Sequence, residues 1–165
     1  LMALILHLQP VDFLKISLPV GAWILLRLIT SFCGVFGFSI MFNSPVRLAA
    51  TAAGIGAIAN TLRLEMVDMT AIPPAGAAFV GALTAGILAS LIKSKVGYPR
   101  ISLTVPSIVI MVPGMYLYRG FYNLGIMSLG PAASWFASAI LIIAALPLGL
   151  IFARILTDKT FRYCT

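Results

Sequence analysis

A short segment in the C-terminal half of the chain combines a helix-breaking pair with polar side chains. Pro113 and Gly114 stand in an apolar stretch, and Tyr116, Tyr118 and Arg119 follow them directly. Proline lacks a backbone donor and glycine tolerates almost any dihedral angles, so a helix should break here. Freed amides, hydroxyls and a guanidinium would together suit a carboxylate. We predict a substrate-binding site at these five residues, with Asn43 as a secondary polar contact. The alternative is a simple kink followed by interfacial aromatic residues, with Arg119 reaching toward water.

Other polar residues are scattered through apolar surroundings. Arg27 lies inside an apolar run, where a guanidinium is costly unless it is paired or faces water. Its two interpretations are snorkelling to the interface and a gating or anion-binding role. Glu65 and Asp68, three residues apart, are either solvated loop carboxylates or proton-coupling groups that share a helical face. Capping and hydrogen bonding between helices are the two options for Asn43 and Asn60.

Enzymatic chemistry is not expected from these residue types. The single histidine, His7, lies near the start of the chain, and no serine, cysteine or carboxylate has a base at a suitable spacing within a span. Cys33 lies in an apolar stretch and Cys164 is the penultimate residue, which is not a disulfide or metal framework. We therefore predict no catalytic residues, no metal and no cofactor.

The composition requires a lipid environment. Of 165 residues, 61% are hydrophobic and only 9% are charged, whereas soluble domains carry about 25% charged residues. The 11 Lys and Arg against four acids give a net charge of +7. These basic residues lie between apolar runs and form no patch interleaved with aromatic residues, so a nucleic-acid partner is excluded.

The elements that must position these side chains are membrane-spanning helices. A span needs about 20 apolar residues, and charge, proline and asparagine mark the breaks. We predict an all-α integral membrane protein, a bundle of five transmembrane helices with the fourth broken at Pro113-Gly114. Residues 1–17 are assigned to no span, and residues 157–165 form a short basic tail. The spans cover about 18–42, 46–64, 73–92, 101–129 and 131–156.

Charge predicts the orientation of these spans. Five crossings put the termini on opposite sides, and cytoplasmic loops of membrane proteins are enriched in Lys and Arg. The other side holds Lys15 and Arg63 in loops, with Arg27 and Arg119 within or at the edges of spans. The C-terminus should therefore be cytoplasmic, since its side holds seven basic residues: Arg47, Lys93, Lys95, Arg100, Arg154, Lys159 and Arg162.

Small residues recur every four positions in three of the spans. Because lipid gives helices no hydrophobic reason to associate, such stripes allow close backbone approach. We expect ordinary packing within the bundle, and the alternative is that the stripe of the third span docks a second membrane protein. The stripes are Ala49, Ala53 and Ala57; Ala78, Ala82, Gly86 and Ser90; and Ala145, Gly149 and Ala153.

Two motifs carry a resemblance to a known family. They are Phe42-Asn43-x-Pro45 and Val112-Pro113-Gly114-x-x-x-Tyr118-Arg119, with two Ala/Gly-rich spans and a basic loop between them. Over residues 20–155 the chain resembles the C-terminal membrane domain of the threonine/serine exporter family.

The resemblance implies an inner-membrane export component driven by the proton gradient. In that family this domain is either fused behind a larger membrane domain or works beside one as a separate small subunit, so the implied partner is a larger membrane subunit. The implied substrates are threonine and serine, and some two-subunit relatives export dicarboxylates such as succinate. A structural subunit that only docks a transporting partner is the competing hypothesis.

Overall fold

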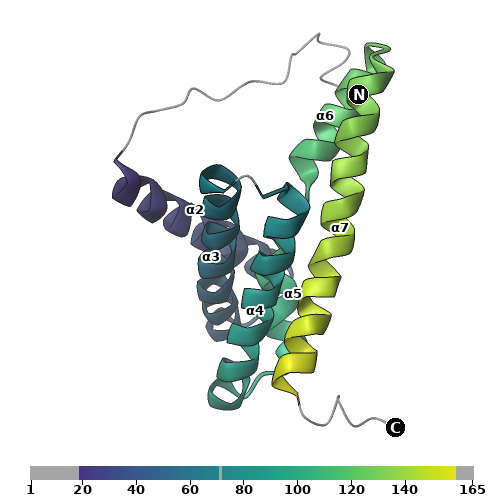
Figure 1. Cartoon of the computed structure of the whole chain (residues 1–165). Coiled ribbons are helices and arrows are strands. Elements are labelled where there is room, and N and C mark those ends of the chain that lie inside the picture. Colours follow the sequence, from purple (N-terminus) through teal and green to yellow (C-terminus); the bar gives the residue numbers. More distant parts are fainter. Residues whose placement is uncertain (1–18, 71, 159–165) are drawn as a thin grey trace, which may run out of the picture.

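The computed structural model describes residues 19–70 and 72–158, and these form α-helices without any strand (Figure 1). The all-helical fold class predicted from the sequence is confirmed. The predictions for residues 1–17, for His7 and for most of the basic tail lie outside the described residues. The helices are α2 (Val20–Met41), α3 (Val46–Met69), α4 (Pro74–Val96), α5 (Arg100–Val109), α6 (Gly114–Gly125) and α7 (Leu129–Thr157).

Three of the described helices are long and apolar enough to cross a membrane. They are α2, α4 and α7, with mean hydropathies of 1.9, 2.0 and 2.5. The pair α5 and α6 is bent by 42° and counts as a fourth crossing if it forms one broken span. The helix α3 has 24 residues, but its small residues and the charges near its end lower its hydropathy. The predicted count of five crossings therefore rests on α3 and stays a prediction.

The break in the fourth segment lies where proline and glycine predict it. The helix α5 ends at Val109 and α6 begins at Gly114. Two other prolines do not interrupt their helices: Pro106 lies inside α5 and Pro147 inside α7.

The helix α3 is longer than expected. Its predicted span ends at residue 64, but the helix continues to Met69. Glu65 and Asp68 are therefore helical, and the interpretation of these residues as loop carboxylates is wrong. Ion pairs with α2, described below, hold this last turn in place.

Successive spans along the chain alternate in direction, but α4 and α7, which pack against one another, are parallel. On α2 and α3, Arg27 pairs with Glu65 while Val35 meets Gly56, so the two helices are antiparallel. The contacts between α4 and α7 advance together along both helices: Ala82 meets Gly149, Gly86 meets Ala153, and Ser90 bonds Thr157. These two helices are therefore parallel. Both end at the bottom of Figure 1, where α5 begins. We call this the basic end, since it carries Lys93, Lys95, Arg100 and Arg154.

The stripe of small residues on α4 is buried inside this chain. Ala78 and Ala82 are fully buried. A Cβ at Gly149 of α7 would lie 2.5 Å from the carbonyl oxygen of Phe79, and one at Gly86 would lie 2.5 Å from the Cβ of Ala153. The stripe therefore packs against α7, and the alternative that it docks a second protein is wrong.

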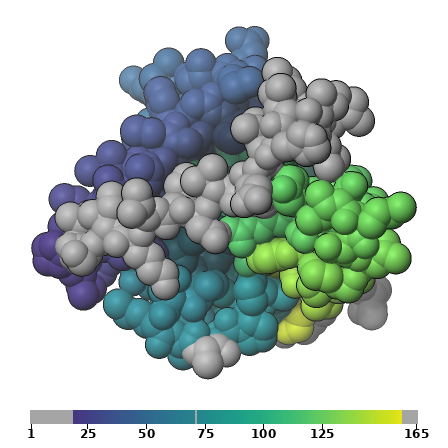
Figure 2. All heavy atoms as spheres, turned by 90° about the horizontal axis from the view of Figure 1, so that it is seen from above, coloured from purple at the N-terminus to yellow at the C-terminus, as the bar shows by residue number. Residues whose placement is uncertain are grey.

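The short helix α5 packs against α2, α3 and α4, with Leu103, Thr104 and Ser107 buried. Its Ser107 Oγ donates to the carbonyl oxygen of Ala52 at 2.9 Å, and a Cβ at Gly56 would lie 2.9 Å from the carbonyl oxygen of Ser107. Seen from above, α2 and α6 occupy opposite flanks of the molecule (Figure 2). The break therefore carries the chain from the contact of α5 with α2, α3 and α4 to the flank of the molecule where α6 lies.

Candidate functional site

The break itself consists of four residues held by short-range hydrogen bonds. The amide of Met111 donates to Ile108 and that of Val112 donates to Val109, at 2.9 and 3.2 Å. The Gly114 amide donates back to Val112 at 2.8 Å. Met111 and Pro113 are buried, so the irregular backbone lies within protein, where a membrane protein can tolerate it.

The amides without a partner near this break belong to the residues that follow Gly114. The Gly114 amide is already used, as stated above. The helix α6 begins without a side-chain cap, so the amides that follow, those of Met115 and Tyr116, belong to the first turn, which has no acceptors within its own helix. A carboxylate that approaches the break would meet these two amides.

Aromatic stacking holds the polar face of α6 against α7. The Tyr116 ring contacts the Trp135 ring edge to face, with 5.5 Å between centroids. The Arg119 guanidinium lies 4.9 Å from the centroid of the same indole, which is a cation–π distance. Tyr118 lies on another side of α6 and is exposed. Trp135 thus joins two of the predicted site residues. Sequence reasoning missed it because this contact depends on how α6 and α7 pack against one another.

Asn43 is not part of this cluster. It lies in the turn between α2 and α3 with φ of 57°, a left-handed conformation that asparagine adopts more readily than most residues. Its neighbours Phe42 and Ser44 line a pocket with α5 residues at the basic end. The structure places Asn43 apart from the Arg119 region, so it gives no support to the predicted role of Asn43 as a secondary substrate contact.

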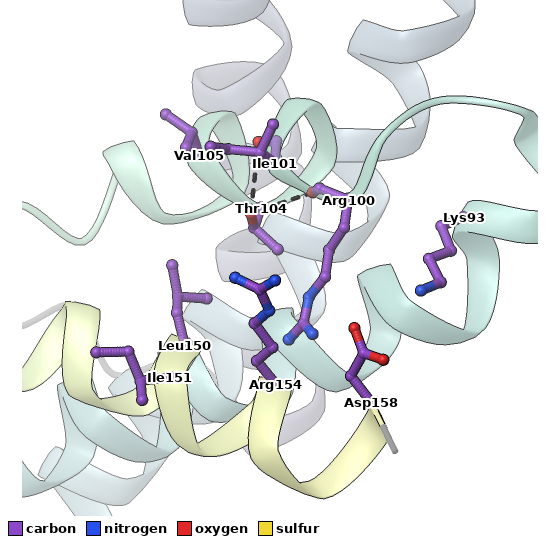
Figure 3. A pocket seen from close by; sticks show the side chains of 9 residues that line it. All are labelled: Lys93, Arg100, Ile101, Thr104, Val105, Leu150, Ile151, Arg154 and Asp158. Atoms are coloured by element: carbon purple, nitrogen blue, oxygen red, sulfur yellow. Dashed lines mark hydrogen bonds between the residues drawn. The ribbon is translucent and has the colours of Figure 1, made fainter. Parts of the chain in front are cut away.

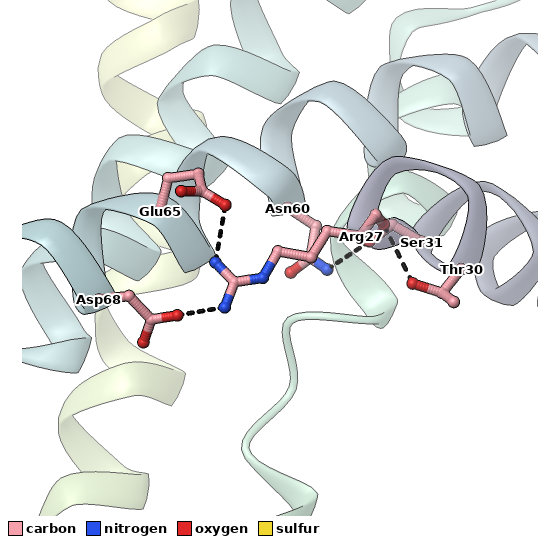
Figure 4. A network of polar contacts seen from close by, with 6 residues as sticks. All are labelled: Arg27, Thr30, Ser31, Asn60, Glu65 and Asp68. Atoms are coloured by element: carbon pink, nitrogen blue, oxygen red, sulfur yellow. Dashed lines mark hydrogen bonds and ion pairs between the residues drawn. The ribbon is translucent and has the colours of Figure 1, made fainter. Parts of the chain in front are cut away.

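Arg27 is paired with both acids of α3 (Figure 4). Its Nη1 lies 2.7 Å from Glu65 Oε1, and its Nη2 contacts Asp68 Oδ2. The guanidinium also lies 5.2 Å from the centroid of the Trp23 ring. Its side chain is 13% exposed, so the ion pairs rather than snorkelling explain how it is tolerated. The four-residue spacing of Trp23 and Arg27 is the signal that could have suggested their contact.

A second polar link joins α2 to α3 one turn deeper. Asn60 Nδ2 donates to Ser31 Oγ at 2.8 Å, and both residues are buried. Arg63 Nε donates to Asn60 Oδ1 at 3.0 Å. Asn60 therefore makes the interhelical hydrogen bond that was one of its two predicted options.

Arg63 connects this link to the break. It is half-buried, and its Cβ and the Met111 sulfur both lie 3.2 Å from the position of a Cβ at Gly81. Tyr116 is close enough to interact with its charge. Among residues 19–70 and 72–158, no carboxylate pairs with Arg63, since Glu65 and Asp68 are bound to Arg27. Sequence reasoning placed Arg63 in a loop and missed it.

We call the residues described above the polar chain, although only some of its neighbouring members are joined by hydrogen bonds, ion pairs or ring contacts. At one end are the two acids of α3, and at the other end is the aromatic cluster of α6 and α7, which consists of Tyr116, Trp135 and Arg119. The hydrogen bonds of Asn60 lie between them. The polar chain holds guanidinium, hydroxyl and amide groups near a break in a membrane helix, and groups of these types can bind an anion. Its members are Glu65, Asp68, Arg27, Ser31, Asn60, Arg63, Tyr116, Trp135 and Arg119.

Comparison with known proteins gives one match. Residues 27–156 match the family described as "Threonine/Serine exporter, ThrE". No curated protein and no solved structure matches the chain. The match includes Arg27 of α2, Arg63 of α3 and the whole of the break.

Proposed function

Because the chain belongs to the threonine/serine exporter family, we propose that it is a subunit of a secondary transporter that exports threonine and serine across the bacterial inner membrane. The family is one of transporters and not of enzymes. Export is driven by the proton gradient and requires a larger partner membrane subunit, because so small a bundle offers few helices to enclose a substrate path.

The single observation that carries this proposal is the position of Arg63. A half-buried guanidinium beside a broken helix, with no acid partner among the described residues, is costly in a membrane protein unless an anion binds there. An amino-acid carboxylate matches its planar donor geometry with two parallel hydrogen bonds. Arg63 is therefore assigned as the primary carboxylate ligand.

The residues predicted from the sequence take supporting roles in this site. Arg119 supplies a second cation at the aromatic cluster, and Tyr116 and Tyr118 supply hydroxyl groups. Pro113 and Gly114 hold the break open, so that the first-turn amides of α6 face the path. Asn43 is left out of the site because it lies at the basic end.

Proton coupling is assigned to Glu65 and Asp68. They are the carboxylates of α3, and Arg27 holds both. A proton that neutralises either carboxylate would weaken its ion pair and loosen the contact between α2 and α3. Such a change would reach Arg63 through Asn60, because Asn60 bonds both Ser31 and Arg63.

A dicarboxylate is the second candidate substrate. Arg119 lies over the ring of Trp135, and Arg63 interacts electrostatically with Tyr116, the ring partner of Trp135. Two cations arranged around one aromatic pair would suit a substrate with two carboxylates, such as succinate.

The test measures efflux of labelled threonine, serine and succinate from cells that express the chain with its larger partner. Arg63→Ala and Arg119→Ala should each lower efflux by at least about tenfold at unchanged membrane level, the loss of one charged hydrogen-bonding group. The lysine variants should recover only part, because a point charge cannot reproduce bidentate recognition. Arg47→Ala, an exposed arginine at the basic end, is the matched control.

Three outcomes of this experiment decide between the hypotheses. Wild-type efflux in Arg63→Ala would remove it from the site. Equal efflux with and without the chain, in the presence of the partner, would contradict the proposed function. Normal efflux in every site variant, together with loss of efflux when the whole chain is deleted, would favour the purely structural subunit.

A further inference from the structure

A pocket of about 400 Å³ lies at the basic end, between the start of α5 and the last turns of α4 and α7 (Figure 3). It is separate from the polar chain described above and shares no residue with it. Its lining contains three cations and one acid: Lys93, Arg100, Arg154 and Asp158.

The two arginines point toward one another across the pocket (Figure 3). Arg100 Nη1 donates to Thr157 Oγ1 at 3.2 Å. Its Nη2 is buried and has no hydrogen-bond partner among the described residues. Two guanidiniums near one another repel, and Asp158 in the same pocket offsets only part of this repulsion, because three cations face one acid. An anion bound between Arg100 and Arg154 would offset the rest.

The position of Arg100 depends on a glycine. A Cβ on Gly86 would lie 3.2 Å from Arg100 Nη2, so the absence of a side chain there leaves room for the guanidinium. The hydroxyl of Thr157 that receives Arg100 also bonds Ser90 at 3.0 Å. Residues from α4, α5 and α7 therefore fix this arginine in place.

The other side of the pocket is apolar. In Figure 3 the charged side chains gather on one side, and Ile101, Val105, Leu150 and Ile151 lie on the other. Ile101, Val105 and Ile151 are exposed, at 67%, 49% and 47%. A free inorganic anion makes no favourable contact with these apolar side chains, whereas the acyl chain of a lipid would pack against them.

We propose that this pocket binds an anionic phospholipid, with its phosphate between Arg100 and Arg154 and an acyl chain along Ile101, Val105 and Ile151. Basic pockets at the ends of membrane helices recognise anionic head groups in this way. Lys93 adds a third positive charge at the rim. The bound lipid clamps the ends of α4 and α7 to the start of α5.

The test uses the purified full chain after removal of lipid, titrated with phosphatidylglycerol or phosphatidylcholine and followed by native mass spectrometry. Phosphatidylglycerol should bind at least about tenfold more tightly, the value expected for a phosphate site with charged donors. Arg100→Gln and Arg154→Gln should each lose about tenfold in phosphatidylglycerol affinity. Lys95→Gln, an exposed lysine at the same end that does not line the pocket, should bind like the unchanged chain.

Two further arms identify the source of the phosphate and guard against misfolding. Inorganic phosphate at millimolar concentration should not displace the lipid, and displacement would overturn the proposal in favour of a free-anion site. Equal affinity for the two lipids, or unchanged affinity in both arginine variants, would also overturn it. If Arg100→Gln fails to fold, the lipid affinity of Arg154→Gln tests the proposal, because Arg154 is exposed and its replacement should not disturb folding. None of these outcomes depends on export activity.

Discussion

Arg27 and Arg63 lie near one another in the fold, yet their surroundings differ. Arg27 is bound to Glu65 and Asp68, whereas Arg63 donates to the neutral Asn60. A paired guanidinium contributes to stability, and one without an acid is available for an anion. The two arginines are therefore expected to fail in different ways when they are replaced.

Arg27→Ala should destabilise the protein by about 2 kcal/mol, because it leaves the carboxylate of Glu65 without its hydrogen-bonded cation. Glu65 is only 17% exposed, so water does not fully replace the lost partner. The measurement is thermal unfolding in detergent, with Arg47→Ala as the control for loss of an exposed arginine.

A double-mutant cycle sharpens this prediction. If the pair acts as the structure indicates, Arg27→Ala and Glu65→Gln together should cost less than the sum of the two single changes. Strict additivity would show that Arg27 and Glu65 are not coupled, and the stabilising role of the pair would have to be abandoned.

At the scale of the elements, the break between α5 and α6 sets the position of the candidate site. Pro113→Ala restores a backbone donor and allows the helix to continue through residues 110–113. Export should fall by at least about tenfold, because a straightened segment moves Tyr116 and Arg119 away from their places. Efflux normalised to membrane level is the measurement.

Pro147 provides the matched control for this change. It lies within the continuous helix α7 and is exposed, so Pro147→Ala should export at nearly the normal rate. Similar losses in both proline variants would mean that the effect is not specific to the break.

The contact of α4 with α7 depends on residues without side chains. Gly149→Ala should lower the free energy of unfolding by about 1–3 kcal/mol, the usual effect of overpacking, because its Cβ would lie 2.5 Å from the Phe79 carbonyl oxygen. Gly130→Ala on the same helix meets nothing within 4 Å and should leave stability unchanged. Thermal unfolding of both variants measures the difference, and equal stability would argue against close packing at Gly149.

For the whole molecule, the alternating directions of the helices and the charge of the basic end lead to one expected orientation. The end with Lys93, Lys95, Arg100 and Arg154 should face the cytoplasm. In a chain with Cys33→Ser, the native Cys164 should react with a membrane-impermeant thiol reagent only after the cells are opened. Met127→Cys, at an 84% exposed position in the α6–α7 turn, should react in intact cells when Cys33 and Cys164 are replaced by serine. Labelling of Cys164 in intact cells would reverse the orientation or change the number of crossings.

The amino-acid sequence by itself determined the local features of this protein. Apolar runs of sufficient length define the helices, and Pro113-Gly114 predicts where the fourth segment breaks, because backbone geometry and missing donors act within a few residues. The polar residues on α6 and the exporter family were also accessible from the sequence, since both depend on residues that are close together in the chain.

The tertiary structure decided which of these residues meet. Arg27 and Glu65 are 38 positions apart, so their pairing depends on the register between α2 and α3. The same register places Glu65 and Asp68 against Arg27, and it places Arg63 near the break without an acid partner among the described residues. Asn43 was separated from Arg119 for a related reason, because the two residues lie toward opposite ends of alternating helices. Contacts between distant segments depend on how whole helices pack, and the spacing of residues along one helix does not determine that packing.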